Sequence, residues 1–134
     1  MTEQPSGPIE AELARARSSL AAARLLKDAG LLHDAVSRAY YSIFHSACAL
    51  VASIGRTVRS HDGLRALVGE HFVKMGVLAP EHARSLARIA GDRNDADYNV
   101  SSVFTPEDVA EDIERAERFL TDVQALLRRA VEKS

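Results

Sequence analysis

Apolar residues in the last part of the chain recur at alternating intervals of four and three positions, and this spacing restricts the fold more than any other feature. The series is Val109, Ile113, Ala116, Leu120, Val123, Leu127 and Ala130. Because an α-helix completes one turn in about 3.6 residues, such a series lies along one side of a helix. A helix with one continuous apolar stripe packs lengthwise against other helices. The spacing therefore predicts an all-α bundle.

Two further helices are predicted in the first half of the chain. The same spacing runs through Ile9, Leu13, Ala16, Leu20 and Ala23, in a helix that begins near Pro8 and ends at Gly30. Residues 31–54 contain the longest apolar segment, and Gly55 follows it. An apolar face of this breadth indicates a helix at the centre of the bundle.

Local signals divide the second half into three helices. Ser60 is the expected N-cap of a third helix, which Gly76 ends. Pro80 suits the first turn of a fourth helix, which runs toward Tyr98. Thr105, Pro106 and Asp108 have the order of an N-cap, a first helical residue and a third-position acid, which approximates a capping box at the start of the last helix. The expected architecture is an up-and-down bundle of about five helices.

Length and composition predict one domain and a cytoplasmic location. The chain has 134 residues and a net charge of −2, so its overall charge does not favour nucleic acid or anionic membrane. We expect residues 1–7 to be a disordered N-terminal tail and residues 8–134 to form the single domain. Cys48 is the only cysteine, which excludes an intrachain disulfide, and no apolar run is long enough for a membrane span.

The segment RNDADYN, residues 93–99, is unusually polar for the end of a helix. Leu86, Ile89, Arg93 and Asp97 follow one another at steps of three or four, so Arg93 and Asp97 are expected on the side that faces the core. A guanidinium in that position needs a partner, and Asp97 lies one turn away. Two interpretations stay open, namely an intrahelical salt bridge with no further role and a functional site.

The central helix carries a second polar stripe beside its apolar face. Asp34, Arg38, Tyr41 and His45 are spaced to share one side of that helix, whereas Tyr40 and Phe44 are assigned to the core. If Tyr41 or His45 faced Arg93, the two stripes would form a small pocket with an anion-binding arginine. The alternative is that His45 is a structural histidine.

A third polar cluster surrounds the predicted start of the third helix. Arg56, Arg59, His61 and Arg65 gather near free helix N–H groups, an arrangement that favours phosphate or carboxylate. A solvated basic loop is the alternative interpretation.

Known catalytic and cofactor motifs do not occur in the sequence. We find no cysteine and histidine spacing typical of zinc, no glutamate followed three residues later by histidine as in di-iron bundles, and no glycine-rich phosphate loop. The motifs therefore predict neither a metal nor a cofactor, and they identify no enzyme.

Three segments in this order and spacing resemble the HEPN superfamily, the "higher eukaryotes and prokaryotes nucleotide-binding" domain. They are SRAYYSIFHSACAL (37–50), SHDGLRALVGEHFVKMG (60–76) and RNDADY (93–98). In particular, they look like the small bacterial and archaeal members of this superfamily. The resemblance implies a helical bundle that forms a homodimer. Many HEPN proteins are metal-independent endoribonucleases, often toxins paired with a nucleotidyltransferase that acts as antitoxin.

The sequence departs from the ribonuclease signature of that family. The signature is an arginine, a polar residue and then a histidine; Arg93 and Asn94 match its beginning, but Tyr98, Asn99 and Val100 occupy the positions where histidine would fall. Tyrosine has an unperturbed pKa near about 10 and is a poor proton shuttle at neutral pH. The resemblance thus implies a protein that binds nucleotide or RNA, or a nucleotidyltransferase partner, without efficient catalysis.

The resemblance and the polar stripes together define the expected site. Arg93 would anchor a phosphate and Asp97 would orient Arg93, while Asn94 and Tyr98 would add hydrogen bonds and Tyr41, His45 and His61 would line the neighbourhood. One alternative is an active endoribonuclease with a rearranged general base, which would use Arg93, Tyr98 and His45. The other alternative is an interaction bundle in which all these residues are structural.

Overall fold

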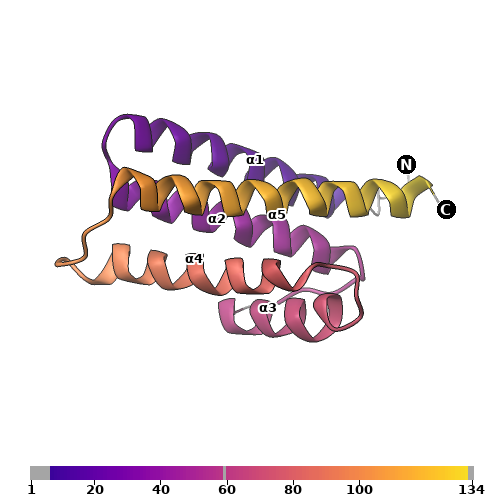
Figure 1. The fold of residues 1–134 in the computed structure, drawn as a ribbon. Coiled ribbons are helices and arrows are strands. Elements are labelled where there is room, and N and C mark those ends of the chain that lie inside the picture. Colours follow the sequence, from indigo (N-terminus) through magenta and orange to yellow (C-terminus); the bar gives the residue numbers. More distant parts are fainter. Residues whose placement is uncertain (1–6, 59, 133–134) are drawn as a thin grey trace.

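The protein is an all-α bundle, as the apolar spacing predicted. The computed structural model describes residues 7–58 and 60–132 (Figure 1). Its elements are α1 (Gly7–Asp28), α2 (Leu32–Ala52), α3 (His61–Leu67), the π-helical segment η1 (Val68–Val73), α4 (Pro80–Tyr98) and α5 (Pro106–Glu132). No strand occurs in the described ranges. Residues 1–6 of the predicted tail lie outside these ranges, and Gly7 already begins α1.

Helix α2 occupies the centre of the bundle. It packs against α1, α4 and α5, while α3 and η1 lie beside α4 at the edge of the molecule (Figure 1). The buried side chains of α2 include Val36, Tyr40, Ile43, Leu50 and Val51. The broad apolar face predicted for this segment is explained by its several helical neighbours.

The two apolar stripes with four-three spacing form much of the core. In α1 the buried members are Leu13, Ala16, Leu20 and Ala23, and in α5 they are Val109, Ile113, Ala116, Leu120 and Val123. Ala130, near the end of α5, is exposed. Phe119 is fully buried although it lies outside the predicted stripe, because α5 contacts α4 as well as α1 and α2.

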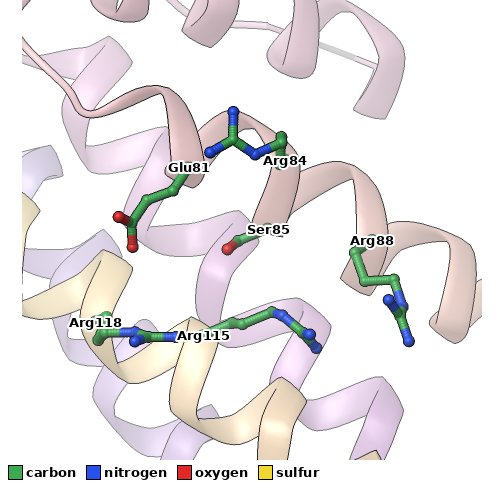
Figure 2. Close-up of a pocket in the computed structure, with 6 residues that line it drawn as sticks. All are labelled: Glu81, Arg84, Ser85, Arg88, Arg115 and Arg118. Carbon is green, nitrogen blue, oxygen red and sulfur yellow. The ribbon is translucent and has the colours of Figure 1, made fainter.

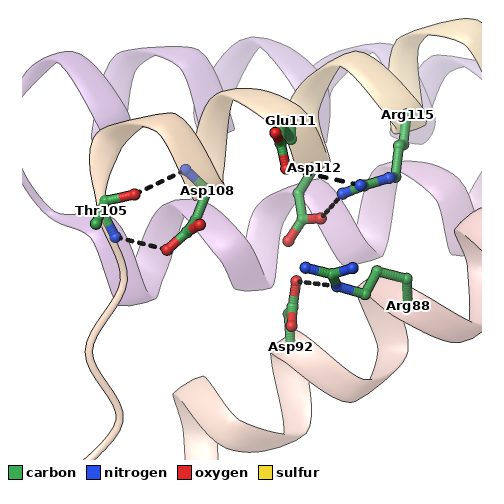
Figure 3. A network of polar contacts seen from close by, with 7 residues as sticks. All are labelled: Arg88, Asp92, Thr105, Asp108, Glu111, Asp112 and Arg115. Atoms are coloured by element: carbon green, nitrogen blue, oxygen red, sulfur yellow. Dashed lines mark hydrogen bonds and ion pairs between the residues drawn. The ribbon is translucent and has the colours of Figure 1, made fainter.

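The predicted helix ends are found where the local signals placed them. Gly30 and Gly55 follow α1 and α2 with φ of +81° and +72°, a backbone conformation that glycine adopts at little cost. At the start of α5, Thr105 N–H donates to Asp108 Oδ2 at 2.9 Å and Asp108 N–H donates to Thr105 Oγ1 at 3.0 Å (Figure 3). The capping box is therefore confirmed, with aspartate in the usual place of glutamate.

The third helix differs from the prediction because it is not one regular α-helix. Ser60 caps it by accepting from the Gly63 N–H at 2.9 Å, but after Leu67 the chain continues as the π-helix η1. The side chains of Leu64, Val68 and Phe72 are all buried, and these positions recur at intervals of four residues. The face that Leu64 turns toward the core is therefore continued by Val68 and Phe72 across the change from α- to π-helix.

Within the described part of the chain, none of the helices combines the length and the apolarity that crossing a membrane requires.

Candidate functional site

Arg93 lies between α4 and α2, on the core-facing side that its spacing predicted. Its side chain is 18% exposed, and its Nε lies 2.8 Å from Asp97 Oδ2, one turn further along α4. Its Nη2 donates to the hydroxyl of Tyr41 on α2 at 3.2 Å. Ser37 on α2 donates to the other oxygen of Asp97 at 2.7 Å. Asp97 thus orients the guanidinium and is itself held by α2.

Two tyrosine rings flank the guanidinium. The Cζ of Arg93 lies 5.2 Å from the ring centroid of Tyr40 and 5.6 Å from that of Tyr41, both within the range of a cation–π interaction. Burial would lower the pKa of Arg93, but Tyr41, Asp97 and the other nearby acidic groups raise it above its ordinary value. The arginine is therefore a fixed positive charge in a partly enclosed aromatic setting.

His61, the first residue of α3, joins this cluster through Tyr40. The Tyr40 hydroxyl is in hydrogen-bond contact with His61 Nδ1, and the two rings are stacked with centroids 5.2 Å apart. Burial raises the pKa of Tyr40 to about 12, so its hydroxyl keeps its proton and donates it to Nδ1. Burial and the charge of Arg93 lower the pKa of His61, so the imidazole is neutral near pH 7 and carries its own proton on Nε2.

His45 forms its hydrogen bond with Glu12, whereas the sequence alone allowed it to face Arg93. Its Nδ1 lies 2.7 Å from Glu12 Oε1 on α1, and its ring centroid is 6.4 Å from that of Tyr41. A carboxylate at Nδ1 favours a proton there and leaves Nε2 as an acceptor. His45 therefore adjoins Tyr41 and has no hydrogen bond with Arg93.

Asn94 and Tyr98 are on the surface of α4. Asn94 is exposed, and Tyr98 is 72% exposed. Tyr98 still acts on Arg93 electrostatically, whereas no described side chain forms a hydrogen bond with Asn94. The predicted ligand contacts of these two residues stay predictions.

The basic cluster near α3 is mostly solvated. Arg56 is exposed, and Arg65 pairs with Asp62 at 2.6 Å on the surface of α3. Arg59 lies outside the described residues. Among the described members of this cluster, His61 joins the group around Arg93 by direct contact, and Arg65 acts on Tyr40 and His61 electrostatically.

Sequence reasoning missed several polar contributors to the structure, among them Ser37, which holds Asp97. Tyr40 was assigned to the core, and it is buried, but its hydroxyl contacts His61; Glu12 and Asp112 were not singled out. Glu12 and Asp112 sit on the borders of apolar stripes, so a charge interrupting a core-facing series was the available signal. No group of three or more described residues could hold a metal ion.

A second polar network lies between α4 and α5 (Figure 3). Asp112 is fully buried on α5, and Arg115 Nη1 donates to its Oδ1 at 2.8 Å (Figure 3). Burial first, and then the neighbouring Asp92, raise the pKa of Asp112 to about 8. Its Oδ2 has no hydrogen-bond donor, and a proton on this carboxyl supplies a hydrogen bond to Asp92.

Comparison of the sequence with known families agrees with the all-α fold. The model of the HEPN domain matches residues 9–126, so the chain belongs to the HEPN family. The match covers all but the first two residues of α1, the whole of α2 to α4, and most of α5.

Relatives from bacteria and archaea match nearly the whole chain. A "UPF0332 protein" of Thermotoga maritima is 34% identical over 113 residues, which are 84% of this chain and 86% of that protein. A protein of Methanocaldococcus jannaschii, named "Putative toxin MJ0605", is 33% identical over 120 residues, which are 90% of this chain and 89% of that protein.

Proposed function

We propose that this HEPN protein has a toxin-type role and that its centre around Arg93 binds the phosphate of a nucleotide or of RNA. One observation carries the proposal: the guanidinium is held in place by Tyr41 and Asp97 but is not saturated by them. Both hydrogens of Nη1 and one of Nη2 have no acceptor among the described residues. A phosphate oxygen is the acceptor that such a group binds best.

The neighbours of Arg93 support a nucleotide more than a bare anion. Tyr41, Phe44 and His61 are all partly exposed, and their rings contact one another or Tyr40. Aromatic rings of this kind stack on bases, and the N–H at His61 Nε2 adds a donor for phosphate. The role as a toxin is suggested by the name of the archaeal relative. The homodimer and the nucleotidyltransferase partner are expectations from the family and stay predictions.

Binding of adenosine and uridine monophosphates, measured by calorimetry, tests the proposal. Arg93→Gln should weaken binding by about tenfold or more, because a charge-assisted hydrogen bond is lost. Arg128→Gln, an exposed arginine on α5, is the matched control and should bind as the unaltered chain does. If neither nucleotide binds, or if Arg93→Gln binds as well as the control, the proposed role of this centre is wrong.

The pair formed by Glu12 and His45 favours a second candidate function, a metal-independent endoribonuclease. With the proton held on Nδ1 by Glu12, Nε2 of His45 is free to act as a general base near Tyr41. His61 is the weaker candidate for a base because its Nδ1 accepts from Tyr40.

Incubation of the purified protein with transfer RNA separates the two candidates. Cleavage that is abolished by both Arg93→Gln and His45→Gln would assign the endoribonuclease activity and place the base at His45. Binding of nucleotides without cleavage would leave the non-catalytic role as the function. Cleavage that survives His45→Gln would exclude His45 as the base.

A further inference from the structure

A groove between α4 and α5 lies apart from the Arg93 centre and is lined almost entirely by arginine. The lining residues are Glu81, Arg84, Ser85, Arg88, Arg115 and Arg118, and the cavity has a volume of about 310 Å³ (Figure 2). Ser85 and Arg88 point from α4 toward α5, where Arg115 and Arg118 lie. The lining carries a formal charge of +3, from four arginines and one glutamate, although the whole chain carries −2.

The charges of this groove are only weakly neutralised by the protein. Arg88 Nε lies 3.6 Å from Asp92 Oδ2, and Arg118 Nη2 lies 3.7 Å from Glu114 Oε1. The side chains of Arg88, Arg118 and Glu114 are more than half exposed. Such exposed ion pairs contribute little to stability, so their arginines can bind an added anion at small cost. Arg84 has no ion pair with any described residue. The groove therefore concentrates positive charge that an added anion can bind.

Among the four arginines of the groove, the side chain of Arg115 is held in place by the largest number of ion pairs. Its side chain is 22% exposed, and it is held by Asp112 at 2.8 Å and by Glu111 at 3.7 Å. A proton on the buried Asp112 removes one negative charge from beside Arg115 at neutral pH. Arg115 then keeps its position while most of its charge is available to a ligand.

The chemistry of the lining selects among anions. It contains no apolar or aromatic side chain, so it offers neither the anchor pockets that peptides use nor a platform for stacking bases. Guanidinium groups bind phosphate oxygens in pairs, and the Ser85 hydroxyl can donate an additional hydrogen bond. We propose that this groove binds a chain of phosphate groups, supplied either by a nucleoside triphosphate or by the backbone of RNA.

The test uses inorganic tripolyphosphate as the probe, with calorimetry of the full chain at low salt. The variant Arg88→Gln/Arg118→Gln removes two exposed arginines of the groove, and Arg15→Gln/Arg128→Gln removes two exposed arginines elsewhere with the same change of charge. The groove variant should bind tripolyphosphate at least about tenfold more weakly, while the control should change by less than about twofold. Equal thermal unfolding of both variants would show that the fold is intact.

Further arms identify the source of the phosphates. If RNA is the ligand, a labelled oligouridine should lose affinity in the groove variant, and the magnitude of the slope of log affinity against log salt should fall by about 1.4. If only adenosine triphosphate loses affinity, the source is a nucleotide. The proposal is overturned if the two double variants bind tripolyphosphate equally, or if polyglutamate binds as tightly as tripolyphosphate, which would indicate an acidic protein partner.

The result is independent of the proposed function. Because the Arg93 centre is itself proposed to bind phosphate, the groove variant and its control are also compared in the Arg93→Gln background, where tripolyphosphate binding that remains reports the groove. Failure of nucleotide monophosphate binding contradicts the Arg93 centre alone, and an equal tripolyphosphate affinity of the two double variants in the Arg93→Gln background contradicts the groove alone.

Discussion

The Nη2 of Arg93 donates a hydrogen bond of 3.2 Å to the hydroxyl of Tyr41, a residue that lies 52 positions earlier in the chain. This contact connects α4 to α2 and places the positive charge of Arg93 against two tyrosine rings. The same residue therefore contributes to stability and to the proposed binding of phosphate.

Arg93→Ala should lower the free energy of unfolding by about 1–3 kcal/mol, because it removes a partly buried hydrogen bond and a cation–π contact. Urea unfolding followed by circular dichroism measures this change. Arg38→Ala is the matched control, since Arg38 is exposed and its Cζ lies 5.8 Å from the Tyr41 ring. A loss for Arg38→Ala as large as that for Arg93→Ala would contradict a special role for the partly buried arginine.

His61 should titrate below the ordinary histidine pKa of 6.5, because it is partly buried and near the charge of Arg93. The unfolded chain then binds more protons than the folded chain in the window below pH 6.5. This contribution to stability is present above that pH and is lost as the pH falls. Histidine NMR titration measures the pKa directly, and Arg93→Gln should raise it; an unchanged value in this variant would exclude Arg93 as a cause.

Asp112 should make the protein less stable as the pH rises from about 4 to about 8. Its pKa is raised from 3.8 to about 8 by burial and by Asp92, although Arg115 opposes the shift. Across this window the folded chain keeps a proton that the unfolded chain releases, so the free energy of unfolding falls with pH. Asp112→Asn, which stays neutral, should flatten the dependence. Urea unfolding at several pH values checks this.

The same experiment has an outcome that contradicts the interpretation. If Asp112 is ionised in the folded protein, its pair with Arg115 at 2.8 Å supplies the stability. Asp112→Asn would then destabilise the protein at neutral pH and leave the slope below pH 8 as it was.

Thr105→Ala should lower the free energy of unfolding by about 1 kcal/mol, because Thr105 Oγ1 accepts from the Asp108 N–H at the start of α5. Thr105→Ser keeps the acceptor and should cost much less. Thermal and urea unfolding of the two variants give the comparison, and an equal loss for both would mean that the hydroxyl cap does not hold this helix end.

The helical class, most helix ends and the apolar stripes of this protein could be predicted from the sequence because each depends on residues close together in the chain, whereas the π-helical segment η1 was not predicted. The spacing of Leu13 to Ala23 and of Val109 to Val123 identified buried faces correctly. The two hydrogen bonds of the capping box likewise join Thr105 and Asp108, which are only three positions apart. Such local patterns require no knowledge of how the helices are arranged.

The sequence by itself therefore determined the all-α class, most of the helix boundaries and the inward direction of Arg93, together with its pairing with Asp97. Only the tertiary structure decided that Tyr41 and Tyr40 flank Arg93, that His61 reaches the cluster through Tyr40, and that His45 pairs with Glu12 instead. These partners come from different helices. Periodicity determines the face on which a side chain lies, whereas the packing of helices against one another determines what that face meets.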